Sequence, residues 1–194
     1  MENRDLKLFA HIPTLETERL MLRRIWPSDL EDVNEYSADP AVPRFLLWSP
    51  HGSKKQTAQY LRIVDRKYKK SEFYDWGVVY KETGKLIGTC GFTSFDVVNN
   101  SAEIGYVLNS SFWGKGLGSE AARAVITFGF EALGLNRIEA IFMPENNSSR
   151  RVLEKCGMVR EGVKRQAIYT KGNYIDVEIY SITRAEYNEI TSEK

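Results

Sequence analysis

The chain has 194 residues, of which 42% are hydrophobic and 27% charged, the balance of an ordinary globular domain. Lys and Arg number 27 against 26 Asp and Glu, so the net charge of +1 excludes a long-range field that would attract nucleic acid or an acidic membrane. No linker or repeat divides the sequence. We therefore expect one domain over residues 1–194, with its core at about 14–182.

The cysteines and the apolar segments bear on the cell compartment. Cys90 and Cys156 are far apart and lack the spacing of a metal site or a disulfide framework, so we expect both to be reduced. Residues 1–13 lack the apolar core of a signal peptide, and no run of about 18 apolar residues occurs. These features predict a cytoplasmic protein with no metal site and no membrane contact.

The first predicted unit is a strand followed by two helices. Residues 19–25 alternate as in a half-buried strand, and Ser28 with Glu31 resembles the capping box of a first helix. The Asp-Pro pair at 39–40 ends that helix. Ser53 then opens a second helix, whose apolar residues recur at helical spacing.

The middle of the chain predicts a meander and then a crossover. Residues 76–80, 86–95 and 102–108 have strand patterns joined by short turns, which predicts three antiparallel strands. A long helical pattern covers 115–133, and a strand follows at 137–143. This order indicates one parallel strand, helix, strand unit.

The last third predicts a helix, a hairpin and a short closing helix. The helix over 149–155 is stopped by Gly157, and the hairpin turns at 171–173. Thr183 with Glu186 predicts a cap for the closing helix. The whole order is mixed α/β (α+β).

A glycine-rich turn, Trp113-Gly-Lys-Gly-Leu-Gly-Ser119, leads into the long central helix. The first amides of a helix lack partners within it, and glycines let an anion approach them, so this turn can bind a pyrophosphate without a basic patch. The alternative is a flexible turn or tight helix packing. A Walker loop is excluded because Lys115 is followed by Gly116, and a dinucleotide fingerprint would need glycine where Ser119 stands.

Three segments follow one another along the chain: Ala102-Glu-Ile-Gly-Tyr106, Phe112-Trp-Gly-Lys-Gly-Leu-Gly-Ser-Glu-Ala121 and the run from Asn146 to Met158. In this order they resemble the successive signatures of the GNAT superfamily of acetyltransferases, and most closely its RimJ/RimL branch, which acetylates ribosomal-protein N-termini. The resemblance covers about residues 14–182. It implies a twisted, mixed but mostly antiparallel sheet of about six to seven strands flanked by helices, with a central pair of splayed strands.

The resemblance also implies acetyl-CoA as cosubstrate. Its pantetheine arm would lie along the splayed strand and its pyrophosphate on the glycine-rich turn, with further contacts from the third segment. The residues implied to bind it are Ile104, Tyr106, Val107, Leu108, Gly114, Lys115, Gly116, Leu117, Gly118, Ser119, Asn146 and Ser149.

Two catalytic residues follow from the resemblance. Glu103 would draw a proton from the incoming amine; the alternative is a surface or salt-bridged glutamate. Ser149 would protonate the departing thiolate, because many relatives have a tyrosine where this chain has Leu153. Water or a tyrosine could also supply that proton, Ser149 could simply cap its helix, and Asn146 could simply form a turn. The amide of Val107 is the candidate donor to the oxyanion.

These residues predict an N-acetyltransferase in which the amine attacks the thioester directly, working as a monomer or homodimer. The expected acceptor is an N-terminal amine of a protein; alternatives are a polyamine or aminoglycoside, or a CoA-binding module with weak catalysis. The acids nearest the acceptor side are spread as on a solvated helix face, which disfavours a polycationic acceptor. They are Asp29, Glu31, Asp32, Glu35 and Asp39.

Overall fold

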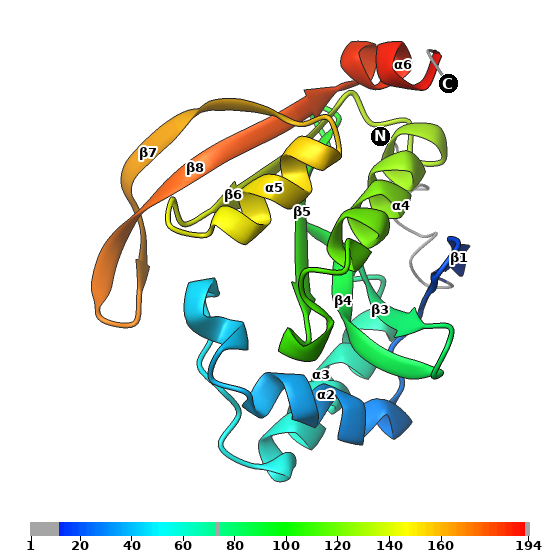
Figure 1. Ribbon diagram of the computed structural model, residues 1–194, viewed down its shortest axis with the longest axis vertical. Helices are drawn as coiled ribbons and strands as arrows, with labels where there is room; N and C mark the ends of the chain where they lie inside the picture. Colours follow the sequence, from blue (N-terminus) through cyan, green and yellow to red (C-terminus); the bar gives the residue numbers. More distant parts are fainter. Residues whose placement is uncertain (1–11, 73, 193–194) are drawn as a thin grey trace.

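The computed structural model describes residues 12–72 and 74–192, which form one sheet with helices against it (Figure 1). The expectation about a signal segment falls largely on residues 1–11, outside the described residues. The strands are β1 (Leu15–Glu16), β2 (Leu20–Arg23), β3 (Tyr74–Tyr80), β4 (Lys85–Asp96), β5 (Ser101–Leu108), β6 (Arg137–Phe142), β7 (Val159–Thr170) and β8 (Asn173–Thr183). The helices are α2 (Leu30–Ala38), α3 (Lys54–Lys69), α4 (Leu117–Glu131), α5 (Asn147–Lys155) and α6 (Arg184–Ser192). Short 3-10 turns are η2 (Pro27–Asp29), η3 (Val42–Phe45) and η4 (Ser110–Phe112).

The sheet has eight strands in the order β1-β2-β3-β4-β5-β6-β8-β7, and only the β5–β6 pair is parallel among the described residues. Six to seven strands were expected, and the structure has eight because the strand β1 pairs with β2. With two residues, β1 is too short to produce an alternating pattern in the sequence. The predicted meander and crossover are confirmed: β3, β4 and β5 are antiparallel neighbours, and α4 links β5 to β6.

The expected capping box at Ser28 and Glu31 is wrong. Asp29 takes that place, because its Oδ2 accepts a hydrogen bond from the Trp26 amide at 2.7 Å. Glu31 instead pairs with Lys54 of α3 at 2.6 Å. The caps predicted elsewhere are present: Ser53 Oγ accepts from the amide of Gln56, and the Thr183 and Glu186 side chains bond each other's backbone amides.

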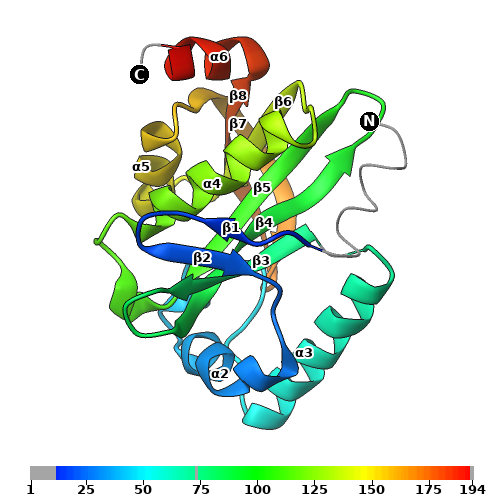
Figure 2. The same ribbon diagram turned by 90° about the vertical axis from the view of Figure 1, so that its right-hand side faces the viewer.

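Helices cover both faces of the sheet (Figures 1 and 2). One core lies under α4 and α5 and includes Trp76 and Phe130; the other lies under α2 and α3 and includes Tyr68 and Val79. Alternation along β3 supplies both cores, since Trp76 and Val78 face one side and Val79 the other. Beside the second core, Asp75 has a buried Oδ1 with no hydrogen-bond partner in the described part of the chain.

The β5 and β6 strands pair only at their first residues. Ser101–Glu103 lie opposite Arg137–Glu139, and the remaining five residues of β5 do not pair with β6. The strands diverge beyond this point (Figure 1), as the resemblance implied. The long β7–β8 hairpin extends past the gap between these diverging strands (Figure 1). Lys171 at its tip donates a hydrogen bond from Nζ to the carbonyl of Pro43 in η3 at 2.7 Å.

Candidate functional site

The glycine-rich turn forms the entrance of α4, as predicted. Gly114 and Gly116 have φ values of +75° and +79°, a left-handed backbone that glycine adopts at no steric cost. Gly116 is the N-cap residue, and α4 begins at Leu117 with no side-chain cap. The first amides of α4 therefore have no partner within the helix, and the helix dipole favours an anion there.

A cleft of about 600 Å³ joins this entrance to the splayed edge of β5 and to the start of α5. Most of the predicted donor-binding residues lie in its lining, namely Tyr106, Val107, Leu108, Gly114, Gly116, Leu117, Gly118, Ser119, Asn146 and Ser149. Two lie outside the lining. The side chain of Ile104 is buried in the core, and Lys115 directs its Nζ over the Phe112 ring, 4.9 Å from the centroid.

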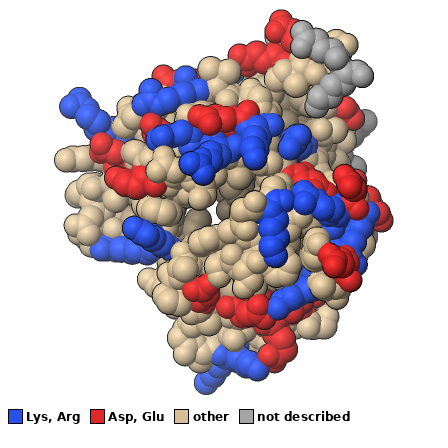
Figure 3. Space-filling view, in the orientation of Figure 1, with Lys and Arg blue, Asp and Glu red and all other residues tan. Residues whose placement is uncertain are grey.

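The charged residues lining the cleft are Arg44, Arg151 and Lys155, with no acid among them. In Figure 3, Lys and Arg side chains gather on this face beside a central hollow. The protein as a whole is nearly neutral, so this local excess was not visible in the composition. A cationic cleft with free helix amides suits a ligand that carries several phosphates.

The start of α5 brings Asn146, Ser149 and Tyr106 together. The Oδ1 of Asn146 accepts a hydrogen bond from the Ser149 amide at 3.1 Å, so Asn146 is the N-cap, and the alternative in which Ser149 caps this helix is wrong. Ser149 Oγ lies 2.7 Å from the hydroxyl of Tyr106, which also donates to the Ser149 carbonyl at 3.2 Å. Burial raises the pKa of Tyr106 and keeps it a neutral donor. Local sequence patterns carry no signal for this pair, because its members are 43 residues apart.

The β4–β5 ladder indicates which amides face the gap between the splayed strands. The amide of Asn109 bonds to the carbonyl of Ile87, and bonding residues alternate along an antiparallel ladder. With Val107 opposite Thr89, its amide points to β4, while the amides of Tyr106 and Leu108 point to the gap. The Val107 amide therefore points away from the gap, which contradicts its expected role as oxyanion donor.

Glu103 lies at the closed end of the splay and outside the cleft lining. Strand alternation places it on the opposite face of β5 from Tyr106. Its Oε1 accepts a hydrogen bond from Thr93 Oγ1 at 2.8 Å, and no ion pair involves it in the described part of the chain. The salt-bridged alternative is thus not what the described residues show.

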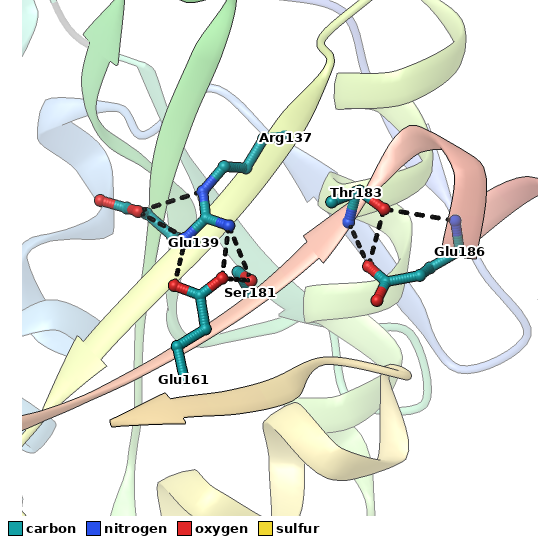
Figure 4. A network of polar contacts seen from close by, with 6 residues as sticks. All are labelled: Arg137, Glu139, Glu161, Ser181, Thr183 and Glu186. Carbon is teal, nitrogen blue, oxygen red and sulfur yellow. Dashed lines mark hydrogen bonds and ion pairs between the residues drawn. The ribbon is translucent and has the colours of Figure 1, made fainter. Parts of the chain in front are cut away.

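A polar network around Arg137 lies beside the pairing of β5 with β6, and Figure 4 shows its side chains. Glu139 lies opposite Glu103 in the parallel register, and Arg137 binds Glu139 at 3.0 Å and Glu161 at 2.6 Å. The Ser181 hydroxyl donates to Glu161 at 2.6 Å, and these bonds, Arg137 foremost, lower the pKa of Glu161 to about 2. Arg137 thus pairs with both Glu139 and Glu161, whereas Glu103 forms no ion pair among the described residues.

The exposed tyrosines of the β7–β8 hairpin lie apart from the cleft. Tyr169 and Tyr174 pair with each other at 4.9 Å between ring centroids and are 64% and 67% exposed on the hairpin, outside the lining. Over residues 12–72 and 74–192, no group of three or more His, Cys, Asp or Glu side chains is placed to hold a metal ion. In the same ranges no helix is both long and apolar enough to cross a bilayer.

Comparison with known proteins gives one family. The model of the acetyltransferase (GNAT) domain matches residues 19–159. The uncharacterized N-acetyltransferase p20 of Bacillus licheniformis is 37% identical over 174 residues, which cover 90% of this chain and 98% of that protein.

Solved structures agree. The GNAT-family acetyltransferase from Bacillus anthracis matches with a TM-score of 0.79 at 30% identity, covering 89% of this chain and 99% of its own. The ribosomal-protein-S5-alanine acetyltransferase of Vibrio fischeri matches with a TM-score of 0.72 at 27% identity, covering 89% and 97%. With a family model over most of its length and a relative aligned almost end to end, the chain belongs to the GNAT family of acetyltransferases.

Proposed function

We propose that this protein transfers the acetyl group of acetyl-CoA to a primary amine, with an N-terminal amine of a protein as acceptor. The observation that carries the proposal is the single cleft that joins the free amides of α4 to the unpaired edge of β5. Acetyl-CoA has an anionic pyrophosphate and an extended arm rich in amides. Both ends of the cleft suit these groups, since helix amides bind phosphates and a strand edge pairs with amides.

The pyrophosphate lies on the amides of residues 116–119, with Arg151 and Lys155 near its phosphates. The pantetheine arm runs along β5 and pairs with the groups that face the gap. The thioester carbonyl then meets the amide of Tyr106 or Leu108, which donates to the oxygen as negative charge develops.

The acceptor nitrogen loses two protons in all, and the thiolate gains one. The ammonium of the acceptor loses its first proton to Glu103 through water, and the neutral amine attacks the thioester carbon. A C–N bond forms, the nitrogen releases its second proton to water, and the C–S bond breaks, so that the electron pair leaves with the thiolate of CoA. Ser149, hydrogen-bonded to Tyr106, donates a proton to that thiolate and is reprotonated by solvent.

The preference for an N-terminal amine rests on the acidic residues between positions 29 and 39. Each acid that could capture a polycation already has a partner: Asp29 binds Arg23, Glu31 binds Lys54, Asp32 accepts from the Leu86 amide, Glu35 binds Lys85 and Asp39 accepts from Ser110. A polyamine or aminoglycoside therefore finds no cluster of free carboxylates in this segment. The Vibrio fischeri protein, named for acetylating an alanine of ribosomal protein S5, is consistent with a protein acceptor.

The test is a turnover screen with acetyl-CoA. Peptides with free N-termini, the same peptides with blocked N-termini, a polyamine and an aminoglycoside are compared at equal concentration, with CoA release as the readout. We expect release only with free N-termini. Efficient turnover of the polyamine or aminoglycoside with none of the peptides would overturn the acceptor assignment, and acetyl-CoA binding without any turnover would indicate a binding module.

A further inference from the structure

The glycine-rich turn is loosely packed at Gly114. A Cβ placed on Gly114 would meet no atom within 4 Å, and both Gly114 and Gly116 have the left-handed backbone. Ordering a loose turn when a ligand binds costs free energy, so a turn that is already ordered binds more tightly. The contacts that hold this turn therefore bear directly on affinity.

Arg19 and Glu120 hydrogen-bond to each other, and Arg19 also hydrogen-bonds to the glycine-rich turn. Arg19 precedes β2, and Glu120 lies in the first turn of α4, 101 residues later. Glu120 Oε1 accepts from the Arg19 amide at 2.8 Å and from Thr17 Oγ1 at 2.6 Å, while Oε2 accepts from Arg19 Nε at 2.7 Å. The remaining Nη1 of Arg19 donates to the carbonyl of Lys115 at 3.0 Å.

That last bond orients the amide that follows it. In a trans peptide the C=O of Lys115 and the N–H of Gly116 point in opposite directions. With the carbonyl held toward Arg19, the Gly116 N–H points away from Arg19. Gly116 lines the donor cleft and Arg19 does not, so this N–H is directed to the cleft side.

The negative charge of Glu120 lies beside the proposed phosphate site and has to be explained. A carboxylate near a site for phosphates repels them, and a neutral residue would serve a simple anion site better. Burial tends to raise the pKa of Glu120, but bonds from Thr17 and Arg19 outweigh it and lower the pKa, so the group stays ionised. An ionised Glu120 holds Arg19 in an orientation that reaches the carbonyl of Lys115.

We propose that Arg19 and Glu120 are positioning residues for acetyl-CoA: together they fix the Lys115–Gly116 peptide so that its N–H faces the pyrophosphate. This inference rests on the proposed function. It predicts that the pair acts on affinity for the donor and leaves the acetyl transfer step unchanged.

The decisive variant is Glu120→Gln, because two explanations predict opposite results. If Arg19 and Glu120 act only through their charges, removing a negative charge beside the anion site tightens acetyl-CoA binding. If they instead position the Lys115–Gly116 peptide, the same change releases Arg19 and weakens acetyl-CoA binding. The expected loss is roughly tenfold in affinity, which corresponds to about 1.4 kcal/mol. Arg19→Lys keeps the positive charge but cannot reach Glu120 and Lys115 together, and it should weaken binding as well.

Binding is measured by calorimetry with acetyl-CoA, and kcat and KM by steady-state kinetics, on variants with melting curves showing that they are folded. Glu31→Gln, which breaks the exposed Lys54 pair, is the matched control and should bind as the parent does. We expect KM for acetyl-CoA to rise with kcat unchanged in Glu120→Gln and Arg19→Lys. Unchanged or tighter binding in Glu120→Gln would overturn the inference, whereas a parent protein that fails to bind acetyl-CoA would overturn the proposed function instead.

Discussion

The hydroxyl of Tyr106 lies 2.7 Å from the Oγ of Ser149, a contact between β5 and the first turn of α5 that spans the mouth of the splay. It couples the residue proposed to protonate the thiolate to a partly buried phenol. The phenol cannot ionise near neutral pH, because burial raises its pKa. Tyr106 can therefore orient the serine hydroxyl throughout the working pH range.

Ser149→Ala should lower kcat about 10- to 100-fold, since it removes a proton donor in the reaction. Tyr106→Phe should lower kcat less, because it keeps the ring and removes only the hydrogen bond. Neither change should raise KM for acetyl-CoA more than a few-fold. Steady-state kinetics measure both constants, and a kcat of Ser149→Ala equal to that of the parent would assign the proton to water.

Glu103→Gln should lower turnover most at neutral and lower pH, where an N-terminal amine, with a pKa of about 7.7–8.0, is largely protonated. Raising the pH delivers the neutral amine from solution and should partly restore the rate. The measurement is a pH-rate profile from about pH 6 to pH 9.5. Profiles of variant and parent that superimpose after scaling for folded protein would mean that Glu103 is structural.

Gly116→Asp should weaken acetyl-CoA binding by at least about 100-fold, because it places a side chain and a negative charge at the amides of the helix entrance. Backbone strain contributes, since φ is +79°. Gly84→Asp is the control: it has a similar φ of +69° in the β3–β4 turn and open space around its Cβ, so it adds comparable strain far from the cleft. Equal affinities of the two variants for acetyl-CoA, measured by calorimetry, would mean that the pyrophosphate does not bind at this turn.

Asp75→Asn should change how stability depends on pH. Burial raises the pKa of Asp75 to about 7, above the value of about 3.9 in an unfolded chain. Between these values the folded state holds a proton that the unfolded state has lost, so the free energy of unfolding of the parent falls as pH rises from about 4 to about 7. The variant lacks this loss and should be more stable above pH 7 by on the order of 2–4 kcal/mol.

Urea unfolding at pH 5 and pH 8 measures this difference. Glu189→Gln, an exposed change on α6, should leave the pH dependence of the parent unaltered. A variant at position 75 that loses as much stability between the two pH values as the parent does would show that Asp75 is ionised without cost.

The elements and most residues of the cleft lining were predictable because their signals are local. The glycine-rich turn is contiguous in sequence, and alternation or helical spacing marks each long strand and helix. Asn146 as the N-cap of α5 could also have been found, since asparagine is among the preferred capping residues. Strand β1 could not, because two residues carry no period.

The contacts that tune the site were beyond local reasoning. Arg19 and Glu120 are 101 residues apart, and Arg137 joins Glu161 and Ser181 from two later strands. Which of many similar charged residues meet is decided by the packing of the sheet. The amide of Val107 was misassigned for a related reason, since the phase of a ladder depends on which residue of the neighbouring strand lies opposite.

The short pairing of β5 with β6 has a mechanical consequence. Three residue pairs join these strands, so between them the sheet lacks a stretch of hydrogen bonding that every other central pair has. An extended pantetheine arm in that gap would act as a ninth, non-peptide strand and would tie the two parts of the sheet together. The donor is then a structural member of the enzyme as well as a reactant: its arrival should slow amide hydrogen exchange along β5 and β6, and its departure as CoA should return the sheet to a divided and more compliant state.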